Sequence, residues 1–191
     1  NGKKENETDI HNVNKRALGL SHLTRDDSKT FIYAFLLGAG TAKVARILRC
    51  NTKTAKGAVD SFISNTKGLH ELRQGMIKRD AARGWFEGLD GRKVINPSEY
   101  LMLAGYLQNG ESVIMKSAAI LWNQWAKEEG LGYKFVNDVH DEWQVEAFTH
   151  EDAVRIGELQ CKALEVAGRD LGCRCPMAGE TKIGFNWYDT H

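Results

Sequence analysis

The sequence has little of several features that would place a protein in a class at once. It contains two prolines and four cysteines among 191 residues, and its formal net charge is only +1. No apolar run approaches the roughly 18 residues that a membrane-spanning helix needs, which excludes such a helix and indicates no membrane partner. The first residues, NGKKENETD, are polar, so no secretory leader is expected and we predict a cytoplasmic protein.

The cysteines do not predict a structural metal. Zinc sites commonly need two close pairs of ligands, and here only Cys173 and Cys175 are close, on a segment that we expect to be a strand. Reduced thiols in a cytosolic protein are the simpler interpretation. The balanced charge does not exclude a nucleic-acid partner, because a local basic patch acts through its own field. Cations do cluster between residues 78 and 93, in KRDAARGW and LDGRK.

The first half of the chain shows mainly helical patterns. A helix is expected over residues 9–18, with Thr8 or Asp9 as its cap. Thr24 is a good N-cap for a second helix, which the glycines at 38 and 40 would end. Thr41 can cap a third helix, and the further helices are expected at 42–49, 53–65 and 69–83.

The second half adds antiparallel hairpins to the helices. Asp90-Gly91 lies between β-forming residues and predicts a short hairpin. Pro97 and Ser98 then open a helix that continues to about residue 128, and the later elements are a hairpin over 135–148, a helix over 150–168 and a C-terminal strand. The pattern predicts an α+β fold with a boundary near Pro97.

Three ionisable residues stand side by side where two β-rich runs meet, in FVNDVHDEWQVEAF: His140, Asp141 and Glu142. A carboxylate held at a rigid turn suits Mg²⁺, which takes oxygen ligands and is usually bound by one or two carboxylates together with substrate phosphates. The alternative is a solvated turn without a function, because Asp favours turns.

Arg25, Lys29 and Tyr33 are spaced so that they lie on one face of one expected helix. Two cations in line with an aromatic ring suit a nucleoside triphosphate, since Arg and Lys bind phosphates and the ring can pack on a sugar or base. The alternative is a solvent-facing basic stripe that Asp26 and Asp27 neutralise.

Taken in order, these stretches resemble the C-terminal part of family A (Pol I-type) DNA polymerases, and most closely their bacteriophage-like branch. The matching motifs are DIH, RDDSKTFIYAFLLGAG, LDGRK, LQNG, VHDE and NWYDTH, and they cover nearly the whole chain. The resemblance implies a right-hand polymerase fragment: mostly helical fingers over residues 1–96, and over residues 97–191 a palm portion with an antiparallel sheet and long helices. If a phage encodes it, the chain would act in the cytoplasm of the host cell.

The resemblance also implies an activity, namely template-directed DNA synthesis. In this reaction a nucleotide is transferred from a dNTP to the 3′-hydroxyl of a DNA primer by a two-metal mechanism. Asp141 would be a ligand of the two Mg²⁺ ions, Glu142 would support the site, and His140 would support the primer end. Lys29 would donate a proton to the leaving pyrophosphate.

The remaining implied roles are binding contacts. The implied dNTP contacts are Arg25, Lys29, Tyr33 and His11. Gln108 would touch the primer–template from the minor-groove side, where base-edge acceptors are shared between base pairs. Arg92 would be a DNA backbone contact, and His140 would also touch DNA.

Some positions depart from the family pattern. Leu37 stands where many relatives have a tyrosine, Ala104 stands where many have an asparagine, and KKENET looks like an insertion before DIH. The family's other metal-binding aspartate belongs upstream of DIH, where this sequence offers no β-rich run containing Asp. We therefore expect a piece of a polymerase that is inactive by itself and has the upstream palm and thumb half as a partner.

Two other interpretations remain. The chain could be a non-catalytic DNA- or nucleotide-binding module derived from such a polymerase, which the missing aspartate favours. A metal-dependent phosphohydrolase built on His140-Asp141 is disfavoured, because the histidines at 11, 70, 150 and 191 show no ligand spacing such as H-x-x-x-H.

Overall fold

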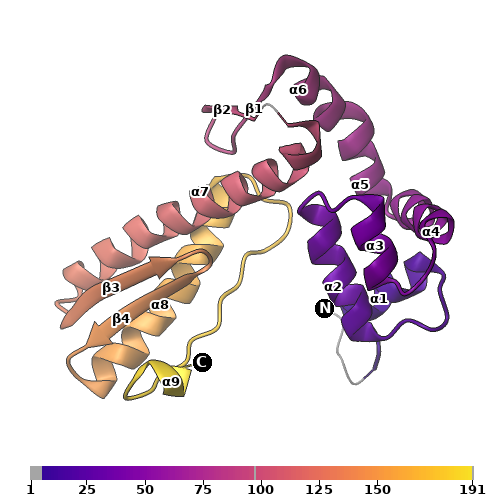
Figure 1. The fold of residues 1–191 in the computed structure, drawn as a ribbon. Coiled ribbons are helices and arrows are strands. Elements are labelled where there is room, and N and C mark those ends of the chain that lie inside the picture. The colour runs from indigo at the N-terminus through magenta and orange to yellow at the C-terminus, as the bar shows by residue number, and fades with distance from the viewer. Residues whose placement is uncertain (1–5, 97, 191) are drawn as a thin grey trace. The chain divides into compact units, whose positions relative to one another are not determined.

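A computed structural model describes residues 6–96 and 98–190 (Figure 1). The chain forms two compact units. The N-terminal unit contains Asn1–Phe86 and Lys93–Tyr106, and the C-terminal unit contains Glu87–Arg92 and Leu107–His191. Helices predominate, and two small antiparallel hairpins complete the secondary structure of the described ranges. None of the described helices combines the length and the apolar character that a membrane span requires.

The N-terminal unit is built from the helices that the sequence predicts. Its segments are α1 (Ile10–Leu18), α2 (Arg25–Leu36), α3 (Thr41–Ile47), α4 (Thr52–Asn65), α5 (Lys67–Leu72), the π-helical turn η1 (Arg73–Ile77), α6 (Lys78–Arg83) and the start of α7 (Glu99–Glu128). The single helix expected over 69–83 is interrupted by η1, which contains Gly75. Glycine destabilises a helix by about 1 kcal/mol relative to Ala, so the wider turn lies where the helix is weakest.

Side-chain caps begin the first two helices. Asp9 caps α1 and Thr24 caps α2, where Thr24 and Asp27 exchange the reciprocal hydrogen bonds of a capping box. The expectation for α3 is wrong by one residue. Gly40 is its N-cap, makes no side-chain hydrogen bond, and leaves Thr41 as the first helical residue.

An aromatic cluster holds α2 against α4. The ring centroids of Phe31 and Phe35 lie 5.6 Å apart, and both meet the edge of Phe62, at 5.3 and 5.6 Å. Phe31 is fully buried. A separate small core of the same unit contains Ile77, Phe86, Met102 and Leu103. Because the phenylalanines occupy the inner side of α2, its other side is left for polar residues.

The short hairpin expected around Asp90-Gly91 is confirmed. Its strands are β1 (Trp85–Glu87) and β2 (Lys93–Ile95). Gly91 has a φ of 79°, a left-handed conformation that glycine adopts without a Cβ penalty. The turn is closed by a hydrogen bond from the Gly91 N–H to the Gly88 carbonyl, with an N···O distance of 2.9 Å.

The C-terminal unit contains the second hairpin, packed with helices. Its elements are the remainder of α7, β3 (Tyr133–Val139), β4 (Glu142–Ala147), α8 (His150–Asp170) and the short α9 (Trp187–Thr190). The two strands pair antiparallel from Tyr133↔Ala147 to Val139↔Glu142, with an irregularity between Phe135 and Asn137. Figure 1 shows α7 and α8 running beside this hairpin.

Trp122 of α7 is the centre of this unit and has no exposed surface. Its ring centroid lies 5.6 Å from Tyr133, 5.3 Å from Phe135 and 6.0 Å from Trp143. These rings come from both strands, so one side chain fixes the hairpin on the helix. The Tyr133 hydroxyl also donates to the Asn123 carbonyl, at 3.2 Å.

The predicted C-terminal strand is wrong. Residues 173–186 are irregular, so Cys173 and Cys175 do not lie on a strand either. Within the described residues the sheet of this unit contains β3 and β4 alone, and a strand without a hydrogen-bonded partner is not stable in water. Instead, this segment, residues 173–186, which we call the tail, packs side chains on α8. Thr181 covers Gly157 and Met177 covers Gly168.

The close approach of Thr181 to Gly157 generates a prediction about the tail. A Cβ at position 157 would overlap the Thr181 side chain, whose Cβ lies 3.0 Å from that point. We expect Gly157→Ala to speed amide hydrogen exchange in residues 177–183 by displacing the tail, although alanine is the better helix former. Gly110→Ala is the control, because a Cβ at position 110 of α7 meets nothing within 4 Å. Unchanged exchange in Gly157→Ala would show that the tail is not seated there.

Candidate functional site

The turn between β3 and β4 consists of His140 and Asp141, because Val139 and Glu142 are the last paired residues. His140 has a φ of 53°, whereas Asp141 is not among the residues with positive φ. A positive φ at the first central residue alone is typical of a type II′ turn, in which glycine usually occupies that position. A histidine held there stores strain of about 1–2 kcal/mol, which the flanking ladder must maintain.

Neighbouring contacts hold the turn in place. Lys116 of α7 forms an ion pair with Asp138, which lies two residues before the turn. After the turn, the Gln144 side chain donates a hydrogen bond to the Glu142 carboxylate. The side chain of Asp141 itself is exposed. The turn therefore presents one carboxylate to solvent on a rigid base.

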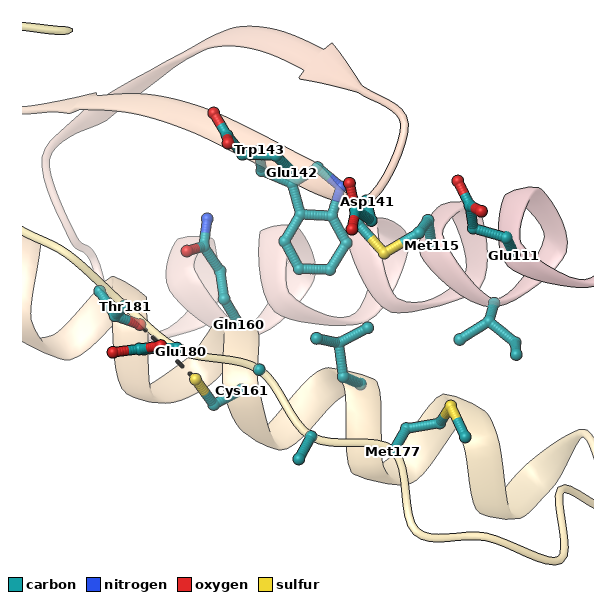
Figure 2. A pocket seen from close by; sticks show the side chains of 14 residues that line it. Glu111, Met115, Asp141, Glu142, Trp143, Gln160, Cys161, Met177, Glu180 and Thr181 are labelled. Carbon is teal, nitrogen blue, oxygen red and sulfur yellow. Dashed lines mark hydrogen bonds between the residues drawn. The ribbon is translucent and has the colours of Figure 1, made fainter. Parts of the chain in front are cut away.

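A cavity of about 370 Å³ lies behind this turn. Figure 2 shows it between α7, the hairpin, α8 and the tail. Four acidic residues are among those that line it: Glu111, Asp141, Glu142 and Glu180. Two further lining residues are Trp143 and Gln160, whose side-chain nitrogens Nε1 and Nε2 are buried and have no hydrogen-bond partner among the described residues. The described residues contain no group of three or more His, Cys, Asp or Glu side chains that could hold a metal ion. Asp141 can thus supply part of a Mg²⁺ shell, with its remaining oxygen ligands coming from other molecules or segments.

In the N-terminal unit, α2 presents the predicted basic face. Lys29 and Tyr33 are exposed, the latter by 55%, and Lys29 forms no ion pair or hydrogen bond with another described residue. The Arg25 side chain is only 27% exposed because its Nε donates to Asp9 Oδ1 at 3.0 Å. Among the described residues, the stripe therefore contains one cation without a partner, Lys29, and one that is already engaged, Arg25.

The acids that engage this face differ from those expected. Asp26 reaches Arg25 only at 3.6 Å and is 89% exposed. Asp27 turns away, to Thr24 and to an ion pair with Arg49. Asp9 is the principal partner of Arg25. The sequence indicated Asp9 only as a helix cap, and no local pattern links it to a residue sixteen positions later.

The Asp9 carboxylate accepts hydrogen bonds from three groups. Besides Arg25, it accepts from the His11 backbone N–H at 3.1 Å and from Asn12 Nδ2 at 2.6 Å. Burial raises the pKa of Asp9, but the hydrogen bonds from Asn12 and His11 and the charge of Arg25 outweigh it, so the pKa lies below its usual value. His11 lies in the same cluster, and its Nδ1 is buried without a partner among the described residues.

The other predicted residues belong to other segments of the chain. Arg92 is 73% exposed and forms an ion pair with Asp90 at the β1–β2 turn. Gln108 is exposed on α7. Leu37, the C-cap of α2, is 55% exposed, and Ala104 is buried in α7. The structure thus gathers Arg25 and His11 around Asp9 in the N-terminal unit, and His140, Asp141 and Glu142 at one turn of the C-terminal unit.

Comparisons with known proteins concern the chain as a whole. The family model for DNA polymerase family A matches residues 4–189. The DNA-directed DNA polymerase of Enterobacteria phage T3 is 33% identical over 203 residues, covering 96% of this chain and 29% of the relative. The DNA-directed DNA polymerase of Escherichia phage T7 is 34% identical over the same length, with the same shares covered. The chain therefore spans less than a third of these relatives.

The fold is similar to that of a solved polymerase domain. The POL domain of Pol1 from M. smegmatis, determined in complex with a DNA primer-template and dNTP, matches with a TM-score of 0.72 and 20% sequence identity. The match covers 85% of this chain and 32% of that chain.

The strained turn generates a prediction about stability. We expect His140→Gly to be more stable than His140→Ala by about 1 kcal/mol, because both variants remove the imidazole and only glycine is free of the left-handed penalty. Urea unfolding of the chain measures the difference. At Gln144, in the middle of β4 and without a positive φ, the order should reverse. Equal stabilities of the two His140 variants would contradict the strain.

Proposed function

The chain belongs to DNA polymerase family A, and from this membership we propose that it takes part in template-directed DNA synthesis. In this proposal residues 1–96 belong to the fingers and residues 97–191 form the second part of the palm. The reaction transfers a nucleotide from a dNTP to the 3′-hydroxyl of a DNA primer. The upstream part of the polymerase, with the thumb and the rest of the palm, is the partner that completes the enzyme.

The observation that carries the proposal is the exposed carboxylate of Asp141 at the β3–β4 turn, which contacts on both sides hold in place. The hairpin rests on Trp122, and the turn adopts a conformation that costs free energy at His140. Strained, non-glycine positive-φ residues are concentrated at functional sites, where the surrounding structure maintains them. A solvated turn without a function would not need a strained residue held by the packing of its hairpin.

The residues present fit part of a Mg²⁺ site. Asp141 offers exposed carboxylate oxygens, and the neighbouring Glu142 accepts a hydrogen bond from Gln144, which orients it. When bound, two Mg²⁺ ions would supply charge neutralisation at the attacking and leaving oxygens. The part of this chain is to hold a ligand oxygen in a fixed place, and the family's second aspartate would come from the upstream partner.

The N-terminal unit supplies groups for the incoming nucleotide. Lys29, exposed and unpaired among the described residues, is free to approach a phosphate and to donate its proton to the leaving pyrophosphate. Arg25 and His11 bind the triphosphate, and the exposed ring of Tyr33 packs on the sugar. Arg binds phosphate as a fork and Lys as a point charge, so the two cations are not interchangeable.

The DNA contacts are assigned to Gln108, Arg92 and His140. Gln108 is exposed and can reach shared acceptors of the minor groove, which suits contact that is independent of sequence. Arg92 must exchange its partner Asp90 for a backbone phosphate. His140 contacts the primer end from the turn itself.

Primer extension tests the proposal. We expect the purified chain to extend a primer with Mg²⁺ and four dNTPs only when the upstream palm and thumb half is added. Asp141→Ala should then lower the rate by at least ~10²–10³-fold, because a metal ligand is lost. Glu165→Ala is the control, since Glu165 is exposed on α8 and distant from the turn in sequence.

Two results would count against the proposal. Extension that survives Asp141→Ala would exclude Asp141 as a metal ligand of the reaction. Salt-dependent binding of primer–template without extension, even with the upstream half, would favour the non-catalytic DNA-binding module.

Lys29 generates a separate prediction. In the assembled polymerase, Lys29→Ala should lower the single-turnover rate of incorporation by ~10²-fold or more, because proton donation to pyrophosphate is lost, and should leave the Kd for DNA almost unchanged. Lys43→Ala on α3 is the control, as another exposed lysine of the same unit. An unchanged incorporation rate would remove Lys29 from the catalytic group.

A further inference from the structure

We propose that Asp9 is a positioning residue for nucleotide binding, one that holds the Arg25 guanidinium and the start of α1 in a single fixed arrangement. The inference rests on the proposed function, in which Arg25 and His11 bind the triphosphate. It adds a carboxylate to a site that is otherwise cationic, and the role of that carboxylate is to orient rather than to touch the nucleotide.

Both oxygens of the Asp9 carboxylate accept hydrogen bonds. Oδ1 accepts from Arg25 Nε at 3.0 Å and from the His11 backbone N–H at 3.1 Å. Oδ2 accepts from Asn12 Nδ2 at 2.6 Å. Asn12 is 4% exposed and the Asp9 side chain is 12% exposed. Asp9 is therefore held from α1 while it holds a side chain of α2.

The contact leaves the phosphate-binding edge of Arg25 available. A guanidinium has five N–H donors in a planar fork, and Asp9 uses only Nε. The terminal nitrogens are engaged weakly, since Nη1 lies 3.6 Å from Asp26, beyond hydrogen-bond distance. A charge-assisted bond at Nε fixes the plane of the guanidinium before a phosphate arrives, and preorganisation of this kind raises affinity because less side-chain freedom is lost on binding.

The low exposure of Asp9 favours its ion pair with Arg25. A mostly buried carboxylate is costly unless it is paired and hydrogen-bonded, and all three of its contacts come from short-range, well-directed donors. An exposed pair such as Arg25 with Asp26 contributes little in comparison. Two acids thus lie beside the same arginine, and the less exposed one, Asp9, is the one that hydrogen-bonds to it and orients it.

Kinetics of the assembled polymerase with Asp9→Asn provide the test. Asparagine caps a helix as well as aspartate does, so α1 is retained while the charge that holds Arg25 is lost. We expect the KM for dNTP to rise by roughly 10-fold, the range of a charge-assisted hydrogen bond, with the Kd for primer–template unchanged. Asp26→Asn is the matched control and should change the KM by less than about twofold.

A double-mutant cycle separates positioning from a structural role. If Asp9 acts through Arg25, then Asp9→Asn should have no further effect on the KM in an Arg25→Ala background. A full additional loss in that background would overturn the inference, as would a single Asp9→Asn variant that behaves like the unaltered enzyme.

A measurement without catalysis distinguishes failure of this inference from failure of the proposed function. In the isolated chain, the NMR signal of Arg25 Nε–H should be protected from exchange, and Asp9→Asn should reduce that protection, because the charge of the acceptor is lost, while Asp26→Asn should not. An unprotected Arg25 Nε–H in the unaltered chain would overturn the inference even if the polymerase is active. An inactive assembly with a protected signal would instead count against the proposed function.

Discussion

The burial of Trp122 is the interaction on which the C-terminal unit depends. Its indole contacts rings from β3 and from β4, so the helix and both strands share one set of van der Waals contacts. A two-stranded hairpin alone is at best marginally stable in water. Packing on Trp122 supplies the stability that lets the same hairpin end in an unfavourable turn. The fixed position of the acid at that turn thus depends on the packing of the hairpin on Trp122.

The N-terminal unit follows the same logic with different residues. Phe31 and Phe35 bury one side of α2 against Phe62, which fixes the rotation of the helix about its axis. Once that rotation is set, Lys29 and Tyr33 must face solvent. Core packing therefore decides which polar side chains a ligand can reach. A substitution that changes the volume of the phenylalanine cluster would rotate α2 and so shift Lys29 and Tyr33, although it contacts neither.

Local signals predicted most of the fold, because they act over a few residues. Thr24 with Asp27, and Asp90 with Gly91, each specify a cap or a turn by their own chemistry. The tail could not be predicted in this way. Its alternating residues are typical of a strand, but no partner strand exists among the described residues, and two glycines of α8 provide a different place for it.

The candidate residues were predicted from the sequence by resemblance and helical spacing, and the partner of one of them was not. Arg25 and Lys29 look equivalent along the helix, whereas within residues 6–96 and 98–190 Arg25 is paired with Asp9 and Lys29 has no partner. The difference arises from Asp9, which the fold brings to α2 through the connection between α1 and α2. A contact of this kind depends on tertiary packing, which neither periodicity nor composition reports.

The glycines under the tail have a consequence for how this chain can diverge. Gly157 and Gly168 are eleven residues apart on α8, close to three helical turns, so they lie on the same face. A side chain from the tail occupies the space beside each glycine: Thr181 beside Gly157 and Met177 beside Gly168. A lineage that acquires a larger residue at either glycine has to accept a smaller or differently placed residue opposite it. We therefore expect positions 157 and 181, and positions 168 and 177, to covary among relatives, as paired positions of one interface inside a single chain.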